Sequence, residues 1–203
     1  MKKYIFTILA FTIITSCKPD PNKQVDEGTV TGNMYHSEEI GWTIEIPEGW
    51  RVTNRAVTQD MQDRGLEAIM EANGVEEYDV SGLKQLISFR KSRSHIFTAT
   101  SEKFELEYEG EYEDNQKYLK EILYNTYVNN GIRVDTTSSK EVIDDLQFNL
   151  FHITVYDAQG NIILYQDLYS RYMNGLDFGV TLNYINEKEK NELKKVWRNS
   201  KFD

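Results

Sequence analysis

Cysteine is almost absent from this sequence of 203 residues, since Cys17 is the only one. An internal disulfide is therefore excluded, and a single thiol at this place needs another explanation. Long apolar runs are absent as well. The longest, Tyr4 to Thr15, has about twelve residues, whereas a helix needs roughly 20 to span the hydrocarbon of a bilayer. This run is too short for a permanent membrane span.

Basic residues are scarce relative to acidic ones. The sequence has 23 Lys and Arg residues against 33 Asp and Glu residues, and without Lys2 and Lys3 the basic count falls to 21, a net charge of −12. We therefore expect no nucleic-acid partner, because phosphate backbones require a basic surface. The same sign opposes direct adsorption of the whole protein to anionic lipid.

Recognisable catalytic motifs are also missing. The sequence contains no Gly-x-Ser-x-Gly elbow, no phosphate-binding Gly-rich loop and no His-Glu-x-x-His pair. The three histidines, His36, His95 and His152, lie far apart and share no metal-ligand spacing. We therefore expect no metal site and no cofactor.

The first 17 residues have the pattern of an export signal. Met1-Lys2-Lys3 is a short basic start, and the apolar run that follows it is typical of a cleavable signal peptide. The signal ends in Ile14-Thr15-Ser16-Cys17, which resembles the lipobox of bacterial lipoproteins. This resemblance implies cleavage between Ser16 and Cys17 and acylation of the Cys17 thiol, which would anchor the protein in a lipid bilayer. A chance cysteine beside a soluble secretory signal is the alternative.

The predicted cellular location and the domain boundaries follow from this interpretation. Residues 1–16 are the predicted signal peptide, and residues 17–33 are the lipidated cysteine and a flexible tether with few bulky apolar side chains. Residues 34–203 are long enough for a single globular domain, which we expect to fold without the tether. Lys18 follows Cys17 where a retention signal would favour Asp, so the outer membrane of a Gram-negative bacterium is expected.

The domain mixes helical and strand patterns. Strands are predicted around Trp42–Ile46, from Leu83 to Lys91 and from Ile96 to Ser101. From Arg133 onward strands dominate, with turns at Asp144-Asp145, at Asp157–Asn161 and at Asn174-Gly175. Helices are predicted from Thr58 to Asn73, from Asp114 to Gly131 and from Asn186 onward, the last with Leu193, Val196 and Trp197 on one stripe.

One predicted strand, Ile162 to Met173, has apolar residues in both alternating sets. A sheet that is apolar on both faces must be covered on both. The sequence therefore predicts an α+β fold, an antiparallel sheet with helices on each face.

Four segments together resemble the PsbP/Mog1-like superfamily. They are Gly41–Trp50 with its Ile-x-Ile-Pro and Gly-Trp pattern, the helix ending Asn130-Gly131-Ile132, the hairpins from Leu146 to Tyr184, and the closing Ser200-Lys201-Phe202. The resemblance implies an α/β/α sandwich and a binding or assembly role, since most members have one. No set of residues here matches the partner contacts of a particular member, so fold alone assigns no partner.

An acidic segment is the richest polar feature. Glu105, Glu107 and Glu109 alternate with aromatic and aliphatic residues, and in a strand this alternation would align the three carboxylates on one face. A solvated acidic loop is the favoured interpretation, because runs of like charge are usually exposed. Binding of a cation or of a basic protein partner by this strip is the alternative.

Two functions from different classes are consistent with the sequence. The first is a non-enzymatic protein-binding or assembly module, anchored at the cell envelope, with a protein as partner. The second is an envelope hydrolase whose residues converge only in three dimensions. A concave pocket holding several carboxylates, or a carboxylate beside His95 or His152, would favour the second.

The anchor is testable by one substitution. Cys17→Ser removes the thiol that takes the acyl chains, and stable anchoring requires at least two chains. The protein should therefore leave the membrane fraction almost completely, as measured by fractionation and by acyl-chain labelling. Retention of the Ser variant in the membrane fraction would contradict the assignment.

Overall fold

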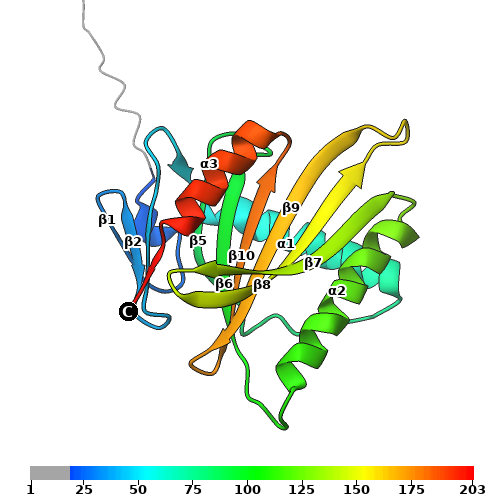
Figure 1. Ribbon diagram of the computed structural model, residues 1–203, viewed down its shortest axis with the longest axis horizontal. Coiled ribbons are helices and arrows are strands. Elements are labelled where there is room, and N and C mark those ends of the chain that lie inside the picture. Colours follow the sequence, from blue (N-terminus) through cyan, green and yellow to red (C-terminus); the bar gives the residue numbers. More distant parts are fainter. Residues whose placement is uncertain (1–18) are drawn as a thin grey trace, which may run out of the picture.

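The computed structural model describes residues 19–203, so the predicted signal peptide, the cleavage site at Ser16 and the lipidation site at Cys17 lie outside the described residues. Within this range the chain forms a mixed α+β fold with two antiparallel sheets and three α-helices (Figure 1). No helix in the range combines the length and the apolar character needed to cross a membrane.

The small sheet has four strands in the order β1-β2-β3-β11, with bounds Thr29–Thr31, Met34–Ser37, Trp42–Glu45 and Lys201–Phe202. The large sheet has seven strands in the order β4-β5-β6-β10-β9-β8-β7. In chain order their bounds are Arg51–Val52, Lys84–Arg90, Ile96–Lys103, Val134–Ile143, Leu146–Tyr156, Ile162–Met173 and Leu176–Tyr184. Every neighbouring pair is antiparallel, as predicted.

The three predicted turns join the last four strands of the large sheet. Asp144, Asp145 and Asn174 adopt positive φ angles of 46°, 63° and 55°. Asp and Asn tolerate this left-handed region better than other residues with a side chain, which is why these pairs mark tight hairpins. The result is the meander β7-β8-β9-β10.

One face of the large sheet is covered by the small sheet and by α3 (Glu187–Arg198). Trp42 of β3 and Trp197 of α3 are both fully buried, and their ring centroids lie 6.2 Å apart. Phe178 of β10 lies 5.2 Å from the Trp42 ring, so one aromatic cluster joins the two sheets and the helix. The predicted start of α3 is confirmed, because the Asn186 side chain accepts a hydrogen bond from the Glu189 N–H.

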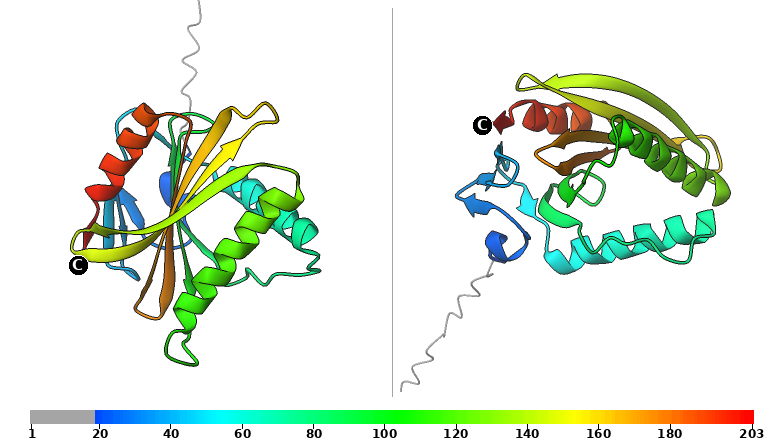
Figure 2. Two further views of the ribbon diagram at one scale, coloured as in Figure 1. Left: turned by 45° about the vertical axis from the view of Figure 1, so that its right-hand side comes forward. Right: turned by 90° about the horizontal axis from the view of Figure 1, so that it is seen from below.

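The other face is covered by α2 (Glu111–Asn129), whose Leu123 and Tyr127 pack on the apolar side chains of β8 and β9. Figure 2 shows α3 and the small sheet on one side of the large sheet, and α2 with α1 on the other. The expected α+β architecture, with helices on both faces, is therefore confirmed. This second core is smaller than the first, with four buried residues at its centre: Val134, Phe151, Ile153 and Val155.

The first two helices begin earlier than predicted. In α1 (Arg55–Asn73) the N-cap is Asn54, whose side chain accepts from the Ala56 N–H, and Thr58 lies inside the first turn. In α2 the N-cap is Gly110 with φ 94°, and the Asp114 N–H already donates to the Gly110 carbonyl. Glycine adopts this angle without strain, so α2 needs no side-chain cap at its start.

The helix α1 does not bury an apolar face. It has no buried residue, and Met61, expected to point inward, is 38% exposed. It is attached along α2 by polar contacts, because Asn73 Nδ2 donates to Thr126 Oγ1 at 3.0 Å and Asn129 Nδ2 donates to the Ala72 carbonyl at 2.7 Å.

The predicted flexible tether is wrong for most of its length. Residues 21–23 form a 3-10 turn, η1 (Pro21–Lys23), residues 29–31 form β1, and Val25 and Val30 are buried in the main core. The tether was predicted from the scarcity of bulky apolar residues, but polar contacts also hold this segment in the fold. Gln24 Oε1 accepts from the Arg55 N–H at 2.8 Å, and Asp26 Oδ2 accepts from the Gln85 N–H at 2.8 Å.

This packing changes the expected minimal domain. A chain that begins at Met34 loses the burial of Val25 and Val30, and burying one valine side chain contributes roughly 1.5 kcal/mol or more. We expect its free energy of unfolding to be lower by about 3 kcal/mol than that of a chain that begins at Lys18. Urea unfolding of the two chains measures the difference, and equal midpoints would contradict the integration of this segment.

Candidate functional site

A cavity of about 200 Å³ lies between α2 and the large sheet. Its floor comes from β6, β9 and β10, and its roof from one side of α2. The walls are mostly apolar, with a few polar groups converging on the interior, which is the usual composition of a binding site. The side chains that define it are Leu83, Thr100, Glu102, Gln116, Leu119, Lys120, Leu123, Phe151, Leu168, Ser170, Asp177 and Thr181.

Strand register places two carboxylates at the floor of this cavity. Glu102 of β6 and Asp177 of β10 are directly opposite each other in the antiparallel ladder. Like charges in this position are unfavourable, so their pairing under a helix is unusual for a purely structural feature. Gly179, two residues further along β10, faces Thr100 and leaves the floor open, because it carries no side chain.

Both carboxyl groups are harder to ionise than usual. Burial raises the pKa of Asp177, although hydrogen bonds from Tyr112 and Gln116 partly offset this. Burial also raises the pKa of Glu102, and the nearby charges of Asp177 and Asp79 raise it further. The environment therefore disfavours negative charge at both positions until a positive group is close.

The two carboxylates differ in their partners. Asp177 accepts from the Tyr112 hydroxyl at 2.8 Å and from Gln116 Nε2 at 3.1 Å, and Ser170 donates to Gln116 Oε1 at 2.7 Å. These contacts fix α2 to the sheet. Within residues 19–203 the Glu102 carboxylate makes no hydrogen bond or ion pair, so it is the group that a ligand can use.

One cation, Lys120, belongs to the roof. Its ammonium group lies 5.6 Å from the centroid of the Phe151 ring and 3.2 Å from Ser138 Oγ, and burial lowers the pKa of this amine. With all three groups ionised, Glu102, Asp177 and Lys120 leave the cavity with one net negative charge. The cavity thus favours a ligand that carries a positive charge.

The predicted acidic strip does not form a strand face. β6 ends at Lys103, and Glu105, Glu107 and Glu109 lie in an exposed loop that leads into α2. The prediction of aligned carboxylates is therefore wrong. Gly110 at the end of this loop starts α2. The strand ends one residue after Glu102, so the glutamate that enters the cavity lies just before the predicted strip.

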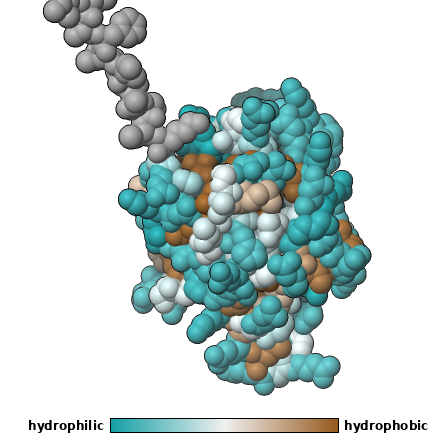
Figure 3. Space-filling view, turned by 90° about the vertical axis from the view of Figure 1, so that its left-hand side faces the viewer, coloured by the Kyte–Doolittle hydropathy of each residue, from teal (hydrophilic) through white to brown (hydrophobic). Residues whose placement is uncertain are grey.

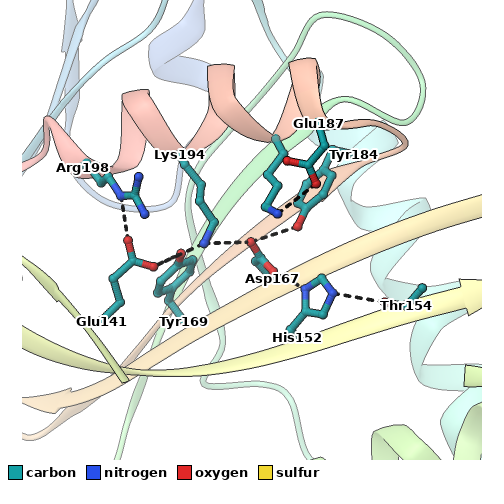
Figure 4. A network of polar contacts seen from close by, with 10 residues as sticks. Glu141, His152, Thr154, Asp167, Tyr169, Tyr184, Glu187, Lys194 and Arg198 are labelled. Carbon is teal, nitrogen blue, oxygen red and sulfur yellow. Dashed lines mark hydrogen bonds and ion pairs between the residues drawn. The ribbon is translucent and has the colours of Figure 1, made fainter. Parts of the chain in front are cut away.

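A second polar cluster lies on the opposite face of the sheet, beneath α3 (Figure 4). The buried Asp167 is its centre: Asp167 Oδ1 lies 2.6 Å from His152 Nδ1, and Oδ2 lies 3.2 Å from the Tyr184 hydroxyl and 3.4 Å from Lys194 Nζ. Burial opposes the ionisation of Asp167, but the contacts with His152 and Lys194 outweigh it and lower the pKa.

The same cluster extends along α3. Lys194 Nζ also lies 3.3 Å from Glu141 Oε2, and Arg198 Nε donates to Glu141 Oε1 at 2.7 Å. Burial opposes the ionisation of Glu141, but the hydrogen bonds from Arg198 and Tyr169 outweigh it and lower the pKa. Because each charge has an opposite neighbour, the cluster attaches α3 to β7 and β9.

Three residues of the cluster are arranged like an acid, base and hydroxyl triad. His152 Nε2 lies 3.1 Å from Thr154 Oγ1, so Asp167, His152 and Thr154 follow each other as an acid, an imidazole and a hydroxyl. Thr154 is only 9% exposed, however, which leaves little of its hydroxyl for a substrate. Asp167 is also shared with Lys194 and Tyr184, as expected for a structural centre.

The other two histidines have local roles. His36 Nδ1 lies 2.9 Å from Thr43 Oγ1 across the small sheet, and His95 Nε2 lies 3.0 Å from the Glu189 carbonyl. In the part of the chain that the structure describes, no three His, Cys, Asp or Glu side chains are grouped closely enough to hold a metal ion.

Comparison with known proteins locates the fold but not the function. No protein-family model matches the sequence, and neither does any curated protein. Among solved structures, the solution structure of cyanobacterial PsbP (CyanoP) from Synechocystis sp. PCC 6803 matches with a TM-score of 0.56 and 11% sequence identity. The match covers 87% of this chain and 98% of the PsbP chain.

The chain has a PsbP-like fold. The resemblance seen in the order of strands and helices is confirmed at this level. At 11% identity the likeness does not transfer a site, and the cavity has to be judged from its own residues.

The Glu102–Asp177 pair predicts a measurable effect of pH on stability. Because the pKa of Glu102 is raised in the folded state, its contribution to stability is present below the ordinary value of 4.5 and is lost as the pH rises through the folded pKa. Glu102→Gln should therefore stabilise the protein near pH 7 by about 0.5 kcal/mol, the size of a like-charge pair on facing strands.

The gain should disappear near pH 4, where the wild-type carboxyl is protonated. Urea midpoints at the two pH values measure it. Glu105→Gln, in the exposed loop, is the matched control and should change neither midpoint. A gain of equal size at both pH values would show that Glu102 is not disfavoured as a charge.

Proposed function

We propose that this chain is a membrane-anchored lipoprotein of the cell envelope, on the outer membrane of a Gram-negative bacterium, and that it is a non-enzymatic binding module for a basic protein partner. The lipobox at Cys17 supports the anchor. One observation carries the binding role: two facing carboxylates, Glu102 and Asp177, lie at the floor of a cavity with apolar walls.

The chemistry of this cavity suits a Lys or Arg side chain of the partner. Leu119, Leu123 and Phe151 offer apolar surface to the methylene stem, and Glu102 offers a carboxylate without a partner to the charged end. Cavities for drug-sized ligands usually measure roughly 300–1,000 Å³. A cavity of about 200 Å³ is better matched to one inserted side chain.

The energetics favour a cation for a specific reason. Removing a carboxylate from water is the main cost of a buried ion pair. Here folding has already met part of that cost, as the raised pKa of Glu102 and of Asp177 indicates. An incoming ammonium or guanidinium group then gains attraction from two carboxylates that are already partly desolvated.

The exposed acidic loop supports the same partner. Glu105, Glu107 and Glu109 lie between the end of β6 and the start of α2, the two elements that carry Glu102 and Gln116 into the cavity. Exposed charges of one sign accelerate the approach of an opposite charge and make binding depend on salt. The proposed role of these three glutamates is to attract the basic partner at a distance, and the proposed role of Glu102 is to recognise the inserted side chain.

A hydrolase is the alternative, and the Asp167–His152–Thr154 geometry is the observation that favours it. The cavity under α2 also meets the condition set from the sequence, because it holds two carboxylates of raised pKa, and such a pair can act as acid and base. Binding is favoured because Asp177 is held by Tyr112 and Gln116, which leaves only Glu102, of these two, open to a ligand.

The charge requirement is testable with two small probes of the same shape. We expect n-butylammonium to shift the amide resonances of β6, β10 and α2 in a nitrogen-15 spectrum of the chain from Lys18 onward, and n-butanol to shift them much less. Glu102→Gln should abolish the difference. The triple variant Glu105→Gln, Glu107→Gln and Glu109→Gln is the matched control, and should keep the difference while reducing its dependence on salt.

The partner is sought with the full-length chain in cells. A photo-crosslinking residue at Leu119, which lines the cavity and is 38% exposed, should give an adduct with one envelope protein. That adduct should be lost on Glu102→Gln and kept in the triple loop variant. Equal shifts by the two probes would refute a cationic site, and an adduct indifferent to Glu102→Gln would refute its use for a protein partner.

A further inference from the structure

The folded body begins almost at the lipidation site. Asp20 caps the turn η1 by accepting from the Asn22 N–H, and Gln24 Oε1 accepts from the Arg55 N–H at 2.8 Å. Only Lys18 stands between Cys17 and Pro19. Since an extended residue spans at most about 3.6 Å, the Cα atom of Cys17 lies within roughly 7 Å of that of Pro19.

This distance has a consequence that rests on the proposed acylation of Cys17. A thiol that carries acyl chains sits at the surface of the bilayer. The surface around Pro19 must then lie within reach of the lipid headgroups. A flexible tether of about sixteen residues would have held the body on the order of 20 Å away and left its orientation free.

A groove of about 760 Å³ lies on this surface. Pro19 and Pro21 line it together with Trp50, Arg51 and Arg90, which come from the end of the β3–β4 loop, β4 and β5. Figure 3 shows hydrophobic residues, in brown, close to the point where the described chain begins. The groove thus combines apolar walls with two guanidinium groups.

The two arginines face each other across the ladder. Arg51 and Arg90 are directly opposite in the antiparallel pair of β4 and β5, a position that like charges disfavour. Within residues 19–203 neither forms an ion pair. Two acidic residues, Glu45 and Glu48, also line the groove, and Glu45 Oε1 accepts from Asn33 Nδ2 at 2.8 Å.

Trp50 adds a side chain that suits a membrane surface. Its ring packs on Phe89 and on His95, with centroid distances of 5.7 and 4.5 Å, which holds it at the edge of the groove. Tryptophan is enriched at the level of lipid headgroups because its ring is apolar and its N–H is polar. Guanidinium groups bind phosphate through paired N–H donors.

We propose that this groove docks on the phosphate groups of the glycerophospholipids in the membrane that carries the anchor. The short link to the acylated Cys17 selects this face over the more basic α3, and the Arg51–Arg90 pair then offers two phosphate-binding groups to the bilayer. In this orientation α2 points away from the membrane together with the cavity beneath it, because α2 lies at the opposite end of the body from β1 and the start of the described chain (Figure 1).

Orientation is measurable on the acylated full-length chain in vesicles of phosphatidylethanolamine and phosphatidylglycerol. Because Cys17 is the only cysteine and is acylated, a second cysteine can be labelled alone. A fluorophore at Glu48→Cys, in the groove, should be quenched by nitroxide-labelled headgroups several-fold more than one at Glu109→Cys, in the acidic loop.

Two changes should reduce the quenching at position 48 to the level at position 109. The first is Arg51→Gln with Arg90→Gln, matched by Arg64→Gln with Arg133→Gln, two exposed arginines on other elements, which should have no effect. The second is a flexible insert of about 12 Gly and Ser residues before Pro19, which lets the body move on the order of 20 Å from the anchor.

The outcomes separate the two proposals. Absence of acyl chains on Cys17, by mass spectrometry, would overturn the proposed anchor. Acylation with equal quenching at positions 48 and 109 would overturn the orientation. Quenching at position 48 that is as strong in phosphate-free vesicles of digalactosyl diglyceride, or that survives loss of both arginines, would overturn phosphate recognition.

Discussion

The large sheet carries apolar side chains on both faces, and much of the structure follows from the need to cover them. On one face the cover is made by Trp42 and Trp197, which come from the beginning and the end of the folded chain and meet with ring centroids 6.2 Å apart. Aromatic side chains of this size bury a large area each, so this contact holds the small sheet and α3 in place. On the other face the cover is α2, which buries far fewer side chains and leaves a cavity above β6 and β10.

That asymmetry explains why the candidate site lies under α2. The α3 face is closed by close aromatic packing and by a polar cluster in which Asp167 and Glu141 both have cationic neighbours. The α2 face instead contains Glu102, for which folding supplies no cation. A protein can keep an unpaired carboxylate under a helix when a ligand completes the pair, and this is the physical basis of the proposed binding role.

The fold was predictable where local patterns decide it. The alternation of Trp42, Ile44 and Ile46, the Asn174-Gly175 turn and the Asn186 cap with its Glu189 partner each specify a local structure, and each is present as expected. The starts of α1 and α2 were misplaced because Thr58 and Asp114, two residue types that often cap helices, lie four positions after the actual N-caps Asn54 and Gly110. The N-terminal segment was misjudged because it has few apolar residues and polar side chains such as Gln24 and Asp26 also hold it to the body, by accepting from the N–H groups of Arg55 and Gln85.

The site was harder to predict because it depends on register. Glu102 lies three residues before the predicted strip, and nothing local distinguishes it from Glu105. Its partner Asp177 is 75 positions away and lies opposite it only after β6 and β10 pair. The alternation of Leu176, Phe178 and Val180 did place Asp177 on the other face of its strand. The position of α2 decides what covers the Asp177 face of β10, and no short sequence pattern predicts that position.

The last strand has a consequence for how the chain folds. β11 pairs with β3, so that Phe202 lies opposite Trp42, and the Phe202 ring also lies 5.7 Å from that of Phe148. Contacts between residues so far apart in sequence form late and slowly, because a long loop has to close first. During synthesis the main core cannot be completed until its final residues are available. A chain with this topology therefore keeps its main core open until β11 has been made and can pair with β3.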